Sequence, residues 1–276
     1  MTRKKGLVQK LISAPYLLWM AVFVIVPLFM VAYFAFLGED GRFTLDNIKN
    51  VAQYGEIFLR SIILAAIATV ICLLISYPIS FILSRMNVKT QSTMLMIVML
   101  PMWMNFLLRT YAWMTLLGNE GLINSFFGLF GLGPFKMLNT QGAIVLGMVY
   151  NYLPYMILPI YSVMVKIDNS ILEAASDLGC NKIKTTIKLV VPLSIPGIMS
   201  GITMVFVPAI STFIISRMLG GGSNLLIGDL IEMQFLGNAY NPNLGSAISL
   251  VLMVIVLIIM AAMNQIDSSD DERVLM

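Results

Sequence analysis

Few residues in this chain of 276 could carry out chemistry, and their types exclude most catalytic sites. There is no histidine, so histidine metal sites and Ser/His or Cys/His triads are excluded. No Gly-Lys-Ser or Gly-Lys-Thr occurs, which excludes a phosphate-binding P-loop in this chain. Cys72 lies in an apolar run and Cys180 in a Lys-rich loop, which indicates two free thiols. We therefore expect no enzyme, no metal and no cofactor.

The spacing of residues 168–179 predicts a short amphipathic helix. Ser170 followed by Glu173 matches a capping box at a helix start, and Gly179 stands where a left-handed residue would end the helix. The apolar residues of this segment fall on one stripe of the helix, at Ile171, Leu172, Ala175 and Leu178.

A second amphipathic segment follows and precedes an apolar run. Ile183 and Ile187 share one side of this segment, and Lys182, Lys184 and Lys188 are available to solvent or lipid headgroups. We expect Pro192 and Pro196 to break the chain before the next span. The apolar face of the short helix must be buried in the chain's own bundle, in a lipid interface or in a groove of a soluble partner. The pattern leaves these three open.

The elements that position these residues are membrane helices. The composition is 59% hydrophobic and 11% charged, with a mean hydropathy of +0.89, which excludes a soluble globular domain and a disordered chain. The net charge of +3 is too small to suggest nucleic-acid binding. Because the composition is so hydrophobic, the expected surroundings are a lipid bilayer. Six runs are long enough to span it: Ala14–Leu37, Ile57–Ser84, Ser92–Leu117, Gln141–Val165, Ile195–Met218 and Leu244–Met263.

The basic residues predict the direction of these spans. The first run is too long for a signal peptide and has no cleavage site after it, so we expect a retained anchor. With the N-terminus in the cytoplasm, the inner segments carry Arg3, Lys4, Lys5, Lys10, Arg85, Lys89, Lys166, Lys182, Lys184, Lys188 and Arg273. The outer segments carry only Arg42, Lys49, Arg60, Lys136 and Arg217. Because basic residues favour the inner side, we expect both termini to be cytoplasmic, in a multi-pass cell-membrane protein.

The segment from Glu173 to Pro192 resembles a known family signature. Glu173-Ala174-Ala175, three residues, Gly179, nine residues and an aliphatic-x-aliphatic-Pro is similar to the EAA motif of permease subunits in binding-protein-dependent ABC importers. Five positions match residue by residue: Glu173, Ala174, Ala175, Gly179 and Pro192. Leu189 and Val191 stand where the family usually has Ile and Leu.

The resemblance implies an all-α MetI-like permease fold of six transmembrane helices with a cytoplasmic coupling helix. It implies an ABC ATPase dimer that docks on this loop, a second permease in a heterodimer and an extracytoplasmic solute-binding protein. The residues it assigns to ATPase coupling are Glu173, Ala174, Ala175, Asp177, Leu178, Gly179 and Pro192. The chain is then divided into an N-terminal segment with the first helix and outer loop (1–56), a permease core with its coupling loop (57–264, loop 166–194) and a cytoplasmic tail (265–276).

A narrower resemblance is to spermidine/putrescine permeases of the PotB type. Four stretches carry it in order along the chain: Thr44–Asn47, Ser76–Pro78, Pro101–Asn124 and Gly220–Ala247. It implies polyamine uptake. A permease for another small organic solute remains an alternative. An ion-coupled secondary transporter is disfavoured, because internal repeats and acids near the midplane are not visible.

A polyamine pathway needs carboxylates and aromatic faces. The candidate residues for a pathway or gate are Trp103, Asn105, Arg109, Tyr111, Trp113, Tyr150, Tyr152, Asp229 and Glu232. Arg109 is a basic residue well inside a span, and we hypothesise that it fixes the outer gate, either as a brace on an acid or helix carbonyls or as a pathway residue. The aromatic residues equally suit core packing or an interfacial belt. The two acids equally suit a solvated loop or a contact with the binding protein.

Overall fold

The computed structural model describes residues 15–38, 40–237 and 239–274. In this part of the chain all regular elements are helices, apart from a bridge between Leu37 and Phe43. The predicted inner residues Arg3, Lys4, Lys5 and Lys10 lie outside the described residues, and so does the side chain of Arg273. The helices are η1 (Ala21–Ile25), α2 (Val26–Ala35), α3 (Asp46–Val51), η2 (Ala52–Tyr54), α4 (Gly55–Ser84), α5 (Val88–Trp103), α6 (Phe106–Leu117), α7 (Leu122–Gly128), α8 (Gln141–Met164), α9 (Asn169–Asp177), α10 (Lys182–Thr185), η3 (Thr186–Val190), α11 (Val191–Ile210), α12 (Ile214–Gly220), α13 (Ile227–Leu236) and α14 (Pro242–Val274).

Long apolar helices account for most of the predicted spans. Among the described residues, five helices are long and apolar enough to cross a membrane, or six if the bent pair that begins with α5 counts as one span. The predicted first, second, fourth and sixth spans are confirmed: they correspond to Pro15–Ala35, α4, α8 and the first part of α14. The chain divides into two compact units, one made of residues 1–55 and 230–255 and the other of residues 56–229 and 256–276.

The third predicted span, Ser92–Leu117, is not one continuous helix. It is divided between α5 and α6, and the bend between α5 and the segment Phe106–Gly128, which contains α6 and α7, is 88°. Met104 adopts an extended conformation, and the Asn105 side chain accepts hydrogen bonds from the backbone N–H groups of Leu107 at 2.9 Å and Leu108 at 3.4 Å. Asn105 therefore starts a new helix as its N-cap, which apolarity alone did not predict.

The fifth predicted span, Ile195–Met218, also differs in the structure. The helical path already begins at Lys182 and runs through η3 to Ile210, so Pro192 and Pro196 do not break the chain as predicted. Pro192 occupies the first turn of α11, where its missing N–H costs little, and a π-helical turn precedes it. The real interruption lies at residues 211–213, between α11 and α12.

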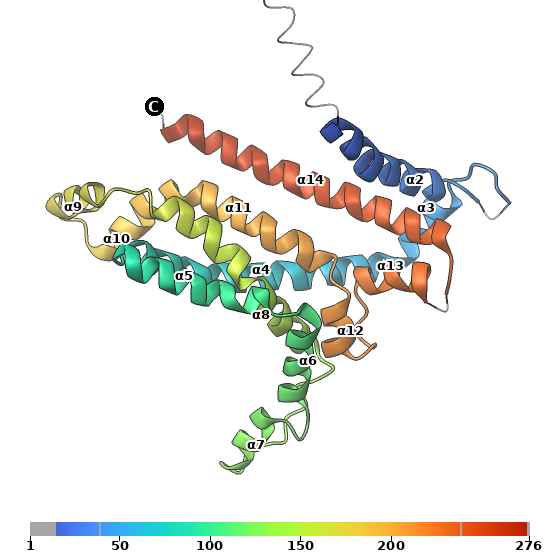
Figure 1. Ribbon diagram of the computed structural model, residues 1–276, viewed down its shortest axis with the longest axis horizontal. Helices are drawn as coiled ribbons and strands as arrows, with labels where there is room; N and C mark the ends of the chain where they lie inside the picture. Colours follow the sequence, from blue (N-terminus) through green and yellow to red (C-terminus); the bar gives the residue numbers. More distant parts are fainter. Residues whose placement is uncertain (1–14, 39, 238, 275–276) are drawn as a thin grey trace, which may run out of the picture. The chain divides into compact units, whose positions relative to one another are not determined.

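The second unit is packed around α8. Many of its largest fully buried side chains come from this helix, among them Ile144, Met148, Met156, Ile160 and Met164. Small residues let the neighbours approach: on α4, Ser80 donates to the Ile157 carbonyl of α8 at 3.1 Å. Gly197 and Gly201 of α11 also allow a close approach, because a Cβ on either would crowd α8. Within this unit α9 and α10 lie at one end, and α6, α7 and α12 lie at the other (Figure 1).

The first unit contains the loop between α2 and α3. Asn47 donates its side-chain amide to the carbonyls of Leu37 at 2.8 Å and Ala35 at 3.3 Å, which satisfies the end of α2. Thr44 donates its hydroxyl to Asp46 at 2.7 Å and accepts the Asp46 backbone N–H. The Thr44–Asn47 stretch is thus a local turn that closes one helix and starts another.

Candidate functional site

The short helix α9 has its N-cap two residues earlier in the chain than the sequence suggested. Its N-cap is Asp168, whose carboxylate accepts the backbone N–H of Ser170 at 3.0 Å, so the prediction of Ser170 as the cap is wrong. This hydrogen bond stabilises the ionised carboxylate and holds the pKa of Asp168 below its usual range. Asp168 is the N-cap because its carboxylate accepts a backbone N–H that has no partner within the helix, and its negative charge lies at the positive end of the helix dipole.

The end of α9 is the left-handed stop that the sequence predicted. Gly179 has φ +77°, and the backbone N–H of Cys180 bonds the Ala175 carbonyl at 3.0 Å. The Gly179 N–H bonds the Ser176 carbonyl at 2.9 Å. These two bonds form a Schellman motif, which satisfies the last carbonyls of the helix. A Cβ on Gly179 would meet nothing within 4 Å, so the glycine is required for backbone conformation and not for space.

The apolar face of α9 finds little cover in its own bundle. Leu178 is 85% exposed and Ile171 is 41% exposed, while Leu172 and Ala175 are partly covered. The acidic residues Glu173 and Asp177 are exposed, as is Ala174. In the next segment Ile183 and Ile187 are 70% and 62% exposed. Of the three burial sites left open by the sequence, the chain's own bundle is therefore disfavoured.

The predicted pathway residues differ in burial and in their contacts. Arg109 of α6 is 7% exposed, and its Nε and Nη1 atoms are buried without a hydrogen-bond partner among the described residues. Its guanidinium lies 5.8 Å from the centre of the Phe106 ring. The carbonyl or acidic brace considered for Arg109 is therefore not formed at these two nitrogens.

The aromatic candidates divide into buried and exposed members. Tyr152 of α8 is buried and donates its hydroxyl to the Pro208 carbonyl of α11 at 3.3 Å. Trp113 and Tyr150 form an edge-to-face pair with ring centres 5.4 Å apart. Trp103 and Tyr111 are 78% and 56% exposed. The first three residues pack within the bundle, whereas the last two face outward from this chain.

The acidic candidates differ in surroundings. Asp229 is buried, and its carboxylate accepts the backbone N–H of Leu226 at 2.9 Å. This contact places it at the start of α13 as a capping group. Glu232 lies one turn later and is half-buried.

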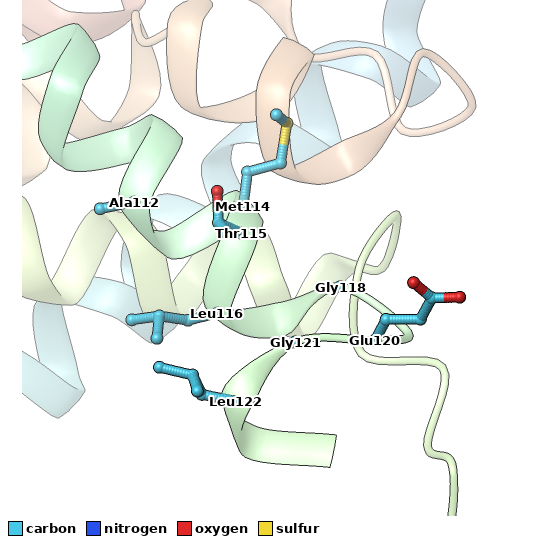
Figure 2. A pocket seen from close by; sticks show the side chains of 8 residues that line it. All are labelled: Ala112, Met114, Thr115, Leu116, Gly118, Glu120, Gly121 and Leu122. Atoms are coloured by element: carbon cyan, nitrogen blue, oxygen red, sulfur yellow. The ribbon is translucent and has the colours of Figure 1, made fainter. Parts of the chain in front are cut away.

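A surface hollow of about 620 Å³ lies beside the turn between α6 and α7 (Figure 2). Its wall is mainly apolar, with Leu116 and Leu122 extending in the same direction, and Glu120 contributes a carboxylate. The backbone of Gly121 closes against the Leu116 carbonyl so tightly that no Cβ would fit. None of the predicted pathway residues lines this hollow.

Comparison with known proteins decides the family. Residues 76–268 match the family of binding-protein-dependent transport system inner membrane components. The chain belongs to this family. It is therefore a multi-pass inner-membrane permease component of such a transport system, with the MetI-like fold.

Relatives of this permease include the spermidine/putrescine transport system permease proteins PotB of Haemophilus influenzae and Escherichia coli. The first is 38% identical to this chain, over an alignment that covers 90% of each protein. The second is 36% identical, over an alignment that covers 86% of this chain and 90% of the relative. A bacterial ABC transporter that imports the acidic polysaccharide alginate has a similar solved structure, with a TM-score of 0.77, 16% identity and 96% coverage of each chain. At that identity the similarity shows the fold alone.

Sequence reasoning missed the role of Arg85, which it treated only as a loop charge. Arg85 follows α4 and donates to the Ile167 carbonyl at 2.9 Å, to the Asn169 side-chain oxygen at 2.7 Å and to the Met164 carbonyl at 3.3 Å. These acceptors lie about eighty residues away along the chain, so no local pattern could reveal them.

Proposed function

We propose that this permease forms half of the membrane pathway of a polyamine importer and that a partner ATPase drives it. The polyamine substrate is supported by the similarity to PotB proteins along nearly the whole chain. The chain itself has no P-loop, so ATP hydrolysis belongs to the partner. A second permease completes the pathway as a heterodimer, and an extracytoplasmic solute-binding protein delivers the substrate.

The exposed helix α9 is the observation that carries this proposal. A nine-residue helix, capped at both ends, presents Ile171 and, directly after its last residue, Leu178 with little cover from its own chain. Such a face fits a groove on a soluble subunit. Lys182, Lys184 and Lys188 follow α9, so the positive-inside preference favours a cytoplasmic position for this end of the second unit, where an ATPase would be.

In the proposed cycle the ATPase pair closes on ATP and moves α9, and the helices packed on α8 change their arrangement. Glu173, Ala174 and Ala175 provide the docking surface, Asp177 and Leu178 extend it, and Gly179 fixes its end. Pro192 stands at the start of α11, so motion of the loop reaches that helix directly. Near the opposite end Arg109, Asn105 and the aromatic residues form the gate region, and the exposed Trp103 and Tyr111 face the second permease.

The test is uptake of labelled spermidine into proteoliposomes that contain this permease, its partner permease and the ATPase, with binding protein outside. We expect uptake that requires both ATP and the binding protein. Unlabelled putrescine should compete, whereas an unrelated neutral sugar should not. A complex that hydrolyses ATP but takes up no polyamine would reject the substrate and leave the importer. Uptake without the ATPase would reject the coupling role of α9.

A further inference from the structure

The turn after α4 is tied to the loop in front of α9 by a single side chain. Arg85 is the first residue beyond α4, and its two terminal nitrogens reach three acceptors within residues 164–169. One acceptor is the last residue of α8, one lies in the linker and one is Asn169, the first residue of α9. The side chain therefore joins the ends of α4 and α8 to the beginning of α9.

The charge of Arg85 suits these acceptors. The last carbonyls of a helix lack partners within the helix and carry partial negative charge. Met164 is the last residue of α8, and besides Arg85 its carbonyl accepts the backbone N–H of Ile167 at 3.2 Å. A guanidinium stabilises such carbonyls with charge-assisted hydrogen bonds, and its planar fork can reach two groups at once. Burial lowers the pKa of Arg85, so these bonds offset part of a desolvation cost. A lysine ammonium is a compact point charge without this planar fork, so it would not reproduce the same three contacts.

A second polar link lies at the same end but does not reach α9. Gln91 of α5 donates to the carbonyls of Met86 at 2.8 Å and Ser84 at 3.3 Å. It also accepts the hydroxyl of Tyr161 of α8 at 3.0 Å. This contact ties α4, α5 and α8 together but does not reach α9. In the described part of the chain, Arg85 is the side chain that links the end of α4 to α9 by a hydrogen bond.

We propose that Arg85 is a positioning residue that makes α4 and the end of α8 follow the movement of α9. This inference rests on the proposed docking of α9 on the ATPase. When the ATPase displaces α9, the Arg85 bonds to Asn169 and Ile167 pull the end of α4 in the same step. Without Arg85, α9 would still dock and the ATPase would still turn over, but the displacement would reach α4 only through weaker contacts.

The first measurement is spermidine taken up per ATP hydrolysed in the reconstituted complex. Arg85→Met removes the charged hydrogen bonds and keeps the length of the side chain, and we expect the ratio to fall about tenfold, as expected for losing bonds of this kind. The ratio for Arg85→Lys should lie between the ratios for Arg85→Met and for wild type. Tyr161→Phe is the matched control, because it removes a hydrogen bond at the same end without touching α9, and its ratio should stay near that of wild type.

The second measurement reports the movement itself and does not depend on uptake. In a variant with Cys72→Ala and Cys180→Ser, spin labels at Met86→Cys and Ser176→Cys give the distance between the turn after α4 and α9. With Arg85 present, we expect this distance to be the same in the resting and the ATP-trapped complexes. With Arg85→Met added, we expect the distance to differ between the two states.

Equal transport ratios in wild type and Arg85→Met, with α9 docked in both, would overturn this inference alone. A trapped-state distance change in wild type would overturn it too. If the wild-type permease failed to bind the ATPase through α9, the proposed function would fail instead. A variant that did not assemble would be replaced by Asn169→Ala, which removes the bond at 2.7 Å only and should lower the ratio to a smaller extent.

Discussion

Gly197 of α11 lies against Pro159 of α8, so close that a Cβ on Gly197 would stand 2.9 Å from the Pro159 carbonyl oxygen. The same Cβ would stand 3.1 Å from the Cα of Ile160. Both neighbours are backbone atoms of a buried helix, so neither can rotate away. This contact makes α8 and α11 pack as one pair, and that pair lies between α9 and the gate region.

Gly197→Val should therefore destabilise the permease. Overpacking of this kind costs about 1–3 kcal/mol, and here the crowded atoms belong to the backbone. Thermal unfolding of the purified complex in detergent should show a lower midpoint. Gly142→Ala on α8 is the control, because its Cβ would meet only the Thr140 hydroxyl at 3.7 Å, an ordinary contact. Equal midpoints for Gly197→Val and wild type would contradict the close packing.

Substitutions of Gly179 should separate backbone conformation from bulk. A β-branched residue at φ +77° is strained, with a cost of roughly 1–2 kcal/mol or more, whereas asparagine tolerates this conformation. We expect Gly179→Val to lose ATPase association and uptake, and Gly179→Asn to retain most of both. Copurification with the ATPase measures the difference. If Gly179→Asn failed as completely as Gly179→Val, the groove itself would exclude side chains there, and the requirement would not be conformational.

Acid should loosen the beginning of α9 through Asp168. Its pKa is lower in the folded protein than in an unfolded chain, so the ionised form stabilises the helix at neutral pH. That contribution is fully present above the unfolded value of about 4 and is lost as pH falls through the lower folded value. Hydrogen exchange of the α9 amides should be unchanged between pH 7 and 5 and faster in stronger acid, after correction for intrinsic rates.

The variants of Asp168 test the same contact at neutral pH. Asp168→Asn keeps an acceptor for the Ser170 N–H and should retain protection. Asp168→Ala removes it and should increase exchange several-fold at the first turn. Equal protection in Asp168→Ala would mean that the cap contributes nothing to α9.

Arg109→Gln should have opposite effects on stability and uptake. The guanidinium is buried with two nitrogens unpaired, so its removal should raise stability by about 1–3 kcal/mol. If the charge fixes the gate in another stage of the cycle, uptake should fall about tenfold or more. Thermal unfolding and spermidine uptake measured on the same preparation give both values. Intact uptake together with intact assembly would refute the gate hypothesis.

Sequence alone predicted the features that depend on local order. Apolar run length located α4, α8 and α14, because a span must carry its own backbone hydrogen bonds through lipid. The left-handed end of α9 followed from Gly179, because few other residues adopt that conformation without strain. The family signature at Glu173 and Gly179 depends on spacing along one chain, so it was also readable.

Tertiary structure decided which polar groups are satisfied and which helices are interrupted. The break at Met104 and Asn105 and the gap after Ile210 lie within apolar sequence, where run length is uninformative. The exposure of Leu178 depends on whether any other helix covers α9, and no local pattern contains that information. The three acceptors of Arg85 lie 79 to 84 residues away in the sequence, and the end of α8 comes near α4 only after the bundle has packed.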